Sequence, residues 1–363
     1  MIDSDFFIKE LFKKKISHLI VVPCSFAKGL INSCINNSKL INYLPCASEA
    51  IACSVAVGLV MSGKKPLLII QSSGLTNMGS CLTSLANPYN IFFPIICSWR
   101  TYKDGDSEIQ HKHLANNLEK LISSYGYTSV KLVPNIIKAN QIIDDSFKKK
   151  QIILLDKNTF SDCKLKNKYI LNLSKYPKRS FYLESLNKMF SKLKNFVFIG
   201  TTGSTSREMY SKMDNCSNFY MAGNMGGALS VGLGAALGGK KVIICGGDAE
   251  FVMHLGGMTT AGRYSDKVFL IYLLFDNEMN KSTGGQNSYQ QHINYLLLGE
   301  SCGWNIIRDK ITSLDVFEKN LKKVINFDRG LFLFHIKCDL DKDFIRPPAI
   351  DIIKSKNSFN SVT

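Results

Sequence analysis

The sequence has 363 residues, of which 45% are hydrophobic; it is too long for one ordinary domain and rich enough to give each of two domains a core. Lysine and arginine total 45 against 29 acidic residues, and the net charge of +16 raises nucleic acid, an anionic membrane or a strongly acidic small molecule as partners. There is no run of about 18 apolar residues, and the N-terminal stretch begins with acids and lacks a small-residue cleavage site. We therefore expect a cytoplasmic protein without a membrane span or a signal peptide.

The basic residues and the cysteines carry no motif of their own. Lysine runs at 12–15 and 147–150 lie at the ends of amphipathic helical patterns, where lysine complements the helix dipole, and no RNA-binding signature accompanies them. We expect no nucleic-acid partner, and a basic nucleic-acid binder stays as an alternative from another class. The eleven cysteines show no CxxC spacing and several lie in apolar stretches, so we expect reduced, buried thiols and no zinc site.

Short apolar runs alternate with helical patterns along the whole chain. The runs that predict strands are 18–23, 66–74, 92–99, 151–156, 195–203, 241–249, 267–277 and 331–339. Nearly continuous apolar strands separated by helices indicate parallel sheets covered on both faces. The stretch 164–180 is charged, contains a proline and has little periodicity. We therefore predict an α/β fold with two doubly wound parallel-sheet domains, 1–165 and 181–363, joined by a linker at 166–180.

Two of the predicted helices, 50–63 and 227–239, are built mainly of small residues. Such helices allow a partner helix or a ligand to approach the backbone closely. Tight packing of each helix on its own sheet is the alternative, and the sequence leaves both open.

Polar residues follow two neighbouring predicted strands at the point where each strand ends. Asp248 follows the run that ends in two glycines, and Asn277 lies one helix and one strand later. Because parallel neighbours end on the same edge of a sheet, the two side chains can converge. A carboxylate, an amide carbonyl, a backbone carbonyl and phosphate oxygens form the hard-oxygen shell that Mg²⁺ prefers. A capped helix start is the alternative interpretation of Asp248.

This unit resembles the magnesium and diphosphate motif of the thiamine-diphosphate enzymes, in which Gly-Asp-Gly is followed one helix and one strand later by Asn. The resemblance implies metal binding by Asp248, Asn277 and the carbonyl of Met279. It implies diphosphate binding by backbone groups of Gly247, Ala249 and Glu250. Ala249 departs from the family, which has glycine there; if the position needs a positive φ, alanine costs about 1 kcal/mol.

The rest of the chain extends the resemblance. Glu49, at the start of a small-residue helix, matches the glutamate that these enzymes place on the aminopyrimidine ring, which makes it the expected catalytic residue. The stretch QSSGLTN resembles the Ser-Gly-x-x-Asn loop that closes over that ring. Further cofactor contacts are implied for Ser73, Gly74, Asn77, Gly203 and Ser204, and for Met225 beneath the bent cofactor. Ordinary core filling is the alternative for Met225.

One branch, the phosphonopyruvate decarboxylases, matches more of the sequence than the family at large. Its matching pieces, such as VPCSF, SWR, TTGSTSRE and GNMGGA, are spread in order over both predicted domains. The middle domain of larger 2-oxoacid decarboxylases has no room here. The resemblance implies substrate binding by Ser25, Arg100, Gln110, His111, Lys281, Ser282 and Thr283. Lys281 departs from the branch, which has an acidic residue before Ser-Thr-Gly-Gly.

The resemblance implies a function and an assembly. We expect decarboxylation of phosphonopyruvate to phosphonoacetaldehyde, dependent on thiamine diphosphate and Mg²⁺, in phosphonate biosynthesis. Decarboxylation of sulfopyruvate or another 2-oxo acid is the alternative within the class. A cofactor-binding homologue that has lost turnover is a third possibility, suggested by Ala249 and Lys281. Enzymes of this type place each cofactor between domains of two chains, so we expect a homodimer or higher homo-oligomer.

Overall fold

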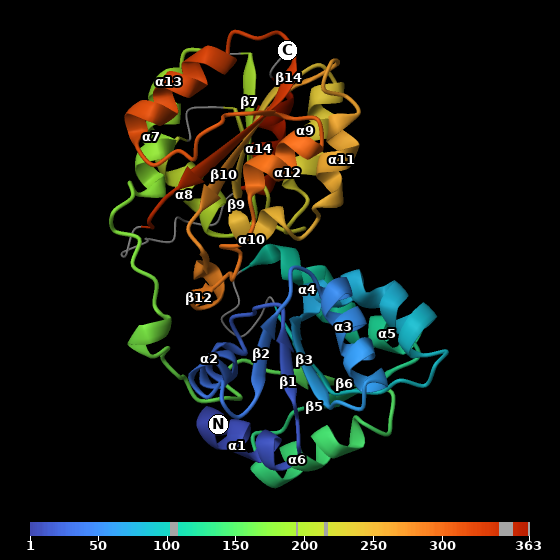
Figure 1. The fold of residues 1–363 in the computed structure, drawn as a ribbon. Coiled ribbons are helices and arrows are strands. Elements are labelled where there is room, and N and C mark those ends of the chain that lie inside the picture. The colour runs from blue at the N-terminus through green and yellow to red at the C-terminus, as the bar shows by residue number, and fades with distance from the viewer. Residues whose placement is uncertain (102–107, 194, 214–216, 341–350, 362–363) are drawn as a thin grey trace. The chain divides into compact units, whose positions relative to one another are not determined.

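The computed structural model describes residues 1–101, 108–193, 195–213, 217–340 and 351–361 (Figure 1). The chain divides into two compact units. The first comprises Met1–Ile170 with Asn280–Asn287, and the second comprises Leu171–Met279 with Ser288–Thr363. Among the described helices, none combines the length and the apolar character that a membrane crossing requires.

The first unit is built on a six-stranded parallel sheet. Its strand order is β2 (Asn42–Pro45), β1 (His18–Val21), β3 (Pro66–Gln71), β4 (Ile95–Ser98), β6 (Gln151–Leu155) and β5 (Thr128–Lys131). Its helices are α1 (Ser4–Lys13), α2 (Lys28–Asn36), α3 (Glu49–Met61), α4 (Ser72–Leu75), α5 (Lys112–Ser124) and α6 (Ile136–Asp145). Helices α1, α2 and α6 gather on one face of the sheet and α3 and α5 on the other (Figure 1), because the strands carry apolar side chains on both faces.

The second unit repeats this architecture. Its sheet has the order β13 (Asn305–Ile306), β14 (Gly330–Lys337), β10 (Phe269–Asp276), β9 (Lys241–Gly247), β7 (Phe196–Gly200) and β8 (Asn218–Tyr220). Its helices are α7 (Arg179–Phe190), α8 (Ser204–Lys212), α9 (Ala228–Leu237), α10 (Asp248–Phe251), α11 (Gly256–Gly262), α12 (Tyr295–Ser301), α13 (Leu314–Val324) and α14 (Ile352–Asn360). Helices α7, α8 and α13 lie on one face, and α9, α11 and α12 on the other (Figure 1).

The predicted fold class is confirmed, since both sheets are parallel and have helices on both faces. The two units meet in sequence between residues 170 and 171, inside the predicted linker 166–180, and α7 begins at Arg179 within that stretch. One segment departs from the expected continuous domain 181–363, because residues 280–287 group with the first unit. There, the buried side chain of Gln286 donates a hydrogen bond of 2.8 Å from Nε2 to Oδ1 of Asn32 in α2.

Each sheet has a point where the strand order reverses. In the first unit the chain runs from β1 outward to β2 and then back to β3 on the other side of β1. In the second unit it runs from β7 to β8 and then to β9 on the other side of β7. Ligands of open α/β sheets bind beyond the carboxyl ends of the strands at such points. The fold therefore directs attention to the loops after β1, β2 and β3, and to those after β7, β8 and β9.

Candidate active site

The two predicted metal-ligand side chains lie at the ends of neighbouring strands. Strands β9 and β10 are paired in parallel, with Gly247 opposite Phe275. Asp248 is the next residue after Gly247, and Asn277 is the second after Phe275. Both side chains are buried, and the Oδ1 atom of Asn277 accepts a hydrogen bond of 3.0 Å from the backbone N–H of Met279. The register thus brings the predicted ligands to one stretch of the carboxyl edge.

Asp248 carries its carboxylate in a buried position. Burial, reinforced by the negative charge of Asp276, raises the pKa of Asp248 to about 7. The hydroxyl of Ser288 donates a hydrogen bond of 2.8 Å to Oδ2, which opposes this rise. A carboxylate in such surroundings is stabilised by a bound cation, and this is the position that the sequence assigned to a magnesium ligand.

Ala249 is not strained in this structure. The residue lies in α10, and it is absent from the residues with positive φ. The conditional cost of replacing the family glycine therefore does not arise. Its neighbour Glu250 is buried, and Tyr272 donates a hydrogen bond of 2.5 Å to Oε2 of Glu250. Burial raises the pKa of Glu250. That side chain is thus held by the sheet, which agrees with the prediction that Glu250 contributes its backbone.

The other two predicted loops of this unit lie at the same edge. Gly203 precedes α8 with φ of 100°, a conformation that side chains rarely adopt. Met225 lies between Asn224 and Gly226, whose φ angles are 57° and 94°. A Cβ at Gly226 would lie 2.8 Å from the Cβ of Met253, so this turn requires glycine. These loops follow β7 and β8, and their positive φ angles fix the course of the chain there.

Sequence reasoning missed Arg179, which lies in the predicted linker. Its guanidinium is 2% exposed and donates to Oε2 of Glu208 (2.6 Å), Oγ1 of Thr205 (2.8 Å) and Oγ of Ser204 (3.1 Å). Burial alone would lower the pKa of Arg179, but the charge of Glu208 outweighs burial and raises it. Arg179 therefore holds the first turn of α8, which includes the predicted cofactor residue Ser204. A buried arginine among lysine-rich neighbours gives no periodic signal that could have revealed it.

In the first unit, Glu49 begins α3 and is 4% exposed. The amide Nδ2 of Asn77 donates a hydrogen bond of 2.9 Å to its Oε2 atom. Gly74 lies against the same carboxylate, since a Cβ at Gly74 would be 2.1 Å from Oε1. The structure thus gathers three of the predicted residues, Glu49, Gly74 and Asn77, from the ends of β2 and β3. Ser73 lies in the same loop and is exposed.

Three of the predicted substrate residues converge on one carboxylate that sequence reasoning missed. The Oε2 atom of Glu108 accepts a hydrogen bond of 2.8 Å from Nε2 of Gln110. It lies 3.4 Å from Nε2 of His111 and 3.7 Å from Nη2 of Arg100. The guanidinium of Arg100 also lies over the ring of Phe26, 5.0 Å from its centroid. Arg100, Gln110 and His111 therefore already act together on an anionic group.

The remaining predicted substrate residues lie on two further segments of the first unit. Ser25 is exposed and follows β1. Lys281, Ser282 and Thr283 form a single 3-10 turn in which Lys281 and Ser282 are exposed. A Cβ at Gly284, the residue after this turn, would lie 2.8 Å from Cγ of Lys28 in α2, so the turn lies against the beginning of that helix.

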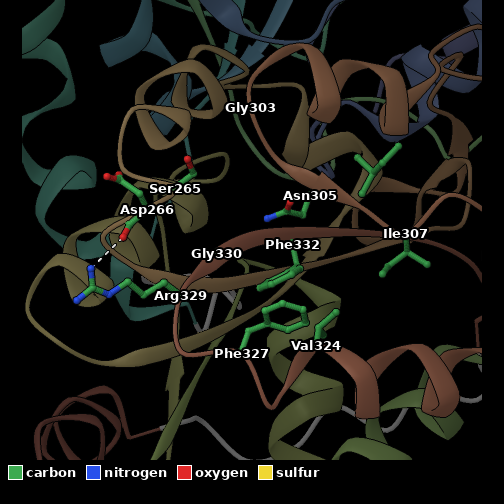
Figure 2. Close-up of a pocket in the computed structure, with 11 residues that line it drawn as sticks. Ser265, Asp266, Gly303, Asn305, Ile307, Val324, Phe327, Arg329, Gly330 and Phe332 are labelled. Carbon is green, nitrogen blue, oxygen red and sulfur yellow. Dashed lines mark hydrogen bonds between the residues drawn. The ribbon is translucent and has the colours of Figure 1, made fainter.

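A pocket of about 530 Å³ lies away from these loops (Figure 2). Phe327 and Phe332 line it, with Asn305 and Arg329 among its polar residues. It lies where β10 and β14 begin, because Gly330 is the first residue of β14. This is the amino edge of the second sheet, whereas every predicted cofactor residue of that unit follows the carboxyl end of a strand.

Comparisons with known proteins agree with this arrangement. Residues 199–336 match the C-terminal TPP-binding domain of thiamine pyrophosphate enzymes, thiamine pyrophosphate being another name for thiamine diphosphate. Phosphonopyruvate decarboxylase of Streptomyces viridochromogenes is 29% identical over 349 residues, 91% of this chain and 85% of that protein. Sulfopyruvate decarboxylase of Methanosarcina acetivorans is 27% identical over 307 residues, 78% of each chain.

The subunit relatives point the same way. The beta subunit of sulfopyruvate decarboxylase from Methanocaldococcus jannaschii is 33% identical over 157 residues, which are 42% of this chain and 80% of that subunit. The predicted residues gather at the carboxyl edges of two parallel sheets, and the relatives that share this pattern are decarboxylases. The chain therefore belongs to the thiamine-diphosphate-dependent 2-oxoacid decarboxylases, the enzyme family that includes phosphonopyruvate and sulfopyruvate decarboxylases.

Proposed function

We propose that this enzyme decarboxylates phosphonopyruvate to phosphonoacetaldehyde and carbon dioxide, with thiamine diphosphate and Mg²⁺ as cofactors. Sulfopyruvate, whose sulfonate has the same tetrahedral shape, is the second candidate substrate. A relative acting on each compound supports each candidate. The phosphonopyruvate decarboxylase aligns over more of the chain, and this favours phosphonopyruvate.

The residues of the second unit fit a magnesium diphosphate. Asp248, Asn277 and the carbonyl of Met279 would hold the metal, and the backbone at Gly247, Ala249 and Glu250 would hold the diphosphate. The carboxylates of Asp248, Asp276 and Glu278 outnumber the single ammonium of Lys337 in this cluster, so a cation would balance its charge. Gly203, Ser204 and Met225 would complete the cofactor contacts from the loops after β7 and β8.

Glu49 would be the catalytic residue of the first unit. When bound, thiamine diphosphate supplies the nucleophilic carbon and the electron sink for decarboxylation. The Glu49 carboxylate would hold the proton at N1′ of the aminopyrimidine ring. Asn77 orients that carboxylate through its hydrogen bond to Oε2, and Gly74 leaves the space that Oε1 occupies. Burial at 4% exposure keeps water from competing for the group.

The convergence of Arg100, Gln110 and His111 on Glu108 is the observation that carries the substrate class. These three side chains surround one anionic oxygen, and a planar guanidinium suits a phosphonate or carboxylate group. The substrate's second anionic group would take the place of the Glu108 carboxylate. Ser25, Ser282 and Thr283 offer hydroxyl groups to the same substrate.

We also propose that the cofactor site forms between chains of a homodimer or higher homo-oligomer. Helices α3 and α9 are apolar around their whole circumference, and each leaves apolar side chains exposed. Ile51 of α3 is 48% exposed, and Val231 and Leu237 of α9 are 37% and 50% exposed. A helix that is apolar on every side is normally buried, so these faces suit a second copy of the chain.

A panel of 2-oxo acids tests the proposed reaction. Aldehyde and carbon dioxide formation should be fastest with phosphonopyruvate, slower with sulfopyruvate and slowest with pyruvate, when compared as kcat/KM. A preference for sulfopyruvate would transfer the function to the second candidate. Binding of thiamine diphosphate without carbon dioxide release from any 2-oxo acid would identify a homologue that has lost turnover.

Replacement of Glu108 tests the anion site within that panel. Glu108→Gln keeps the shape of the side chain and removes its charge, so the KM for phosphonopyruvate should fall while the KM for pyruvate stays unchanged. Glu119→Gln is the matched control, because Glu119 accepts a hydrogen bond from Ser129 on an exposed part of α5. A KM for phosphonopyruvate that is unchanged in Glu108→Gln would contradict the proposed anion site.

A further inference from the structure

The loop that follows β10 contains a strained residue between the two predicted metal ligands. Glu278 has φ of 55°, in the left-handed region that residues other than glycine rarely adopt. It directly follows Asn277 and directly precedes Met279. Strain of this kind persists only where the surrounding structure holds the residue in place.

Several contacts hold Glu278 in that conformation. Its N–H donates to Oδ1 of Asp276 (3.2 Å), and its carbonyl accepts from the N–H of Ser288 (2.9 Å). Its Oε2 atom accepts from Nε2 of Gln291 (3.2 Å), and its Oε1 atom accepts from Nζ of Lys337. Lys337 is the partner that brings a full charge to this loop from the sheet itself.

Lys337 is an unusual residue for the end of a buried strand. It closes β14, lies opposite Asp276 in the strand register and is 2% exposed. Its Nζ atom lies 3.1 Å from Oδ2 of Asp276 and also bonds Glu278. One ammonium therefore holds the residues on both sides of Asn277. Asp276 has a second partner, because Nε2 of His335 lies 2.7 Å from the same oxygen.

The alternative is that this ion pair only stabilises the fold. Buried ion pairs contribute little net stability compared with apolar residues of the same size. Asp276 would keep His335 as a partner without the lysine. What the lysine adds is the bond to the strained Glu278, and that bond acts on the course of the loop.

We propose that Lys337 is a positioning residue for the metal site: by holding Asp276 and Glu278, it fixes the Asn277 side chain and the Met279 carbonyl in a geometry that binds a divalent cation. This inference rests on the proposed function, because it takes Asn277 and Met279 as the ligands. Lys337 itself touches neither the metal nor the substrate.

Calorimetric titration of Mg²⁺ into protein saturated with thiamine diphosphate tests the inference. Lys337→Met should weaken Mg²⁺ binding about 10- to 100-fold, the usual effect of removing a group that supports metal ligands. Glu278→Gln is the milder variant, should Lys337→Met fail to fold, and should weaken binding by a smaller factor. Mg²⁺ affinity within twofold of wild type in the variant that folds would overturn the proposal.

The double variant Lys337→Met, Glu278→Gly provides a readout that a purely structural role would not give. Glycine adopts a φ of 55° without strain, so the loop should need the lysine less. We expect the double variant to bind Mg²⁺ more tightly than Lys337→Met alone. If Lys337 acted only through its charge, glycine at 278 would restore nothing, and that result would also count against the proposal.

Hydrogen exchange on the cofactor-free protein separates this inference from the proposed function. Amides of residues 277–280 should exchange faster in Lys337→Met than in wild type, while those in the middle of β14 stay protected. Wild-type protein that binds neither Mg²⁺ nor thiamine diphosphate would refute the proposed function. Unchanged exchange at 277–280 would refute the positioning role on its own.

Discussion

Gly74 illustrates how a single missing side chain shapes the candidate site. A Cβ there would lie 2.1 Å from Oε1 of Glu49, and the flexible carboxylate would have to move. Gly74→Ala should therefore lower kcat by about 100-fold, the effect expected when a catalytic group is displaced by about 1 Å, while the melting temperature changes little. Gly256→Ala is the control, because a Cβ at Gly256 meets open space. Equal kcat in the two variants would show that Glu49 tolerates displacement.

Asp248 gives the enzyme a pH dependence whose sign can be derived. Its carboxyl loses a proton near pH 4 in the unfolded chain, whereas burial and Asp276 raise the pKa to about 7 in the folded protein. Between these values the folded state binds more protons, so cofactor-free protein should lose stability as pH rises from about 4 to 7. Melting temperatures of wild type and Asp248→Asn across this window measure the effect, and the variant should show a smaller decline.

Magnesium should act on the same residue in the opposite direction. Metal binding requires the ionised carboxylate, so the cofactors should raise the melting temperature more at about pH 8 than at about pH 5. A thermal shift that does not depend on pH would argue against Asp248 as a ligand.

At the scale of elements, the central strands were predictable and the edge strands were not. Strands β1, β3, β4, β6, β7, β9, β10 and β14 all fall in predicted runs. The missed strands β2, β5, β8 and β13 are the outer strands of the two sheets. An edge strand has one neighbour, needs fewer apolar residues and is short, as the NYLP of β2 and the TSVK of β5 show. Periodicity therefore fails where burial on both faces ends.

Helix α14 shows how the exposed edge strand β8 is covered. The hydroxyl of Ser355 accepts a hydrogen bond of 3.0 Å from the N–H of Tyr220 and donates one of 3.1 Å to the carbonyl of Asn218. Ser355→Ala leaves both backbone groups without this partner and should lower the free energy of unfolding by about 1–3 kcal/mol. Ser361→Ala, at the exposed end of the same helix region, should change it by less than about 0.5 kcal/mol. Urea denaturation compares them, and equal values would mean that α14 does not protect the edge.

At the scale of the whole molecule, the proposed assembly makes a prediction about mixtures. Glu49→Gln and Asp248→Asn should each be inactive as pure proteins. If each site combines Glu49 of one chain with Asp248 of another, a mixed dimer contains one intact site. Unfolding and refolding an equal mixture should then recover about a quarter of wild-type activity, because half the dimers are mixed and each has one good site of two. No recovered activity would place both residues of a site in one chain.

The assembly itself depends on apolar helix faces that can be tested separately. Val231→Glu introduces a charge on the exposed face of α9 and should reduce the mass measured by sedimentation velocity to that of a smaller species. Ile137→Glu is the matched control, since Ile137 is 75% exposed on α6. Equal masses for both variants would exclude α9 from the interface.

The sequence by itself determined the fold class, the family and most residues of the candidate site. Continuous apolar runs report burial on both faces of a strand, and short motifs after a strand keep their spacing because the turn there has little freedom. Only the tertiary structure revealed Glu108, Arg179 and Lys337, and the grouping of residues 280–287 with the first unit. Each of these residues acts through a charge paired with a group distant or unpatterned in sequence, and pairing in space leaves no period along the chain.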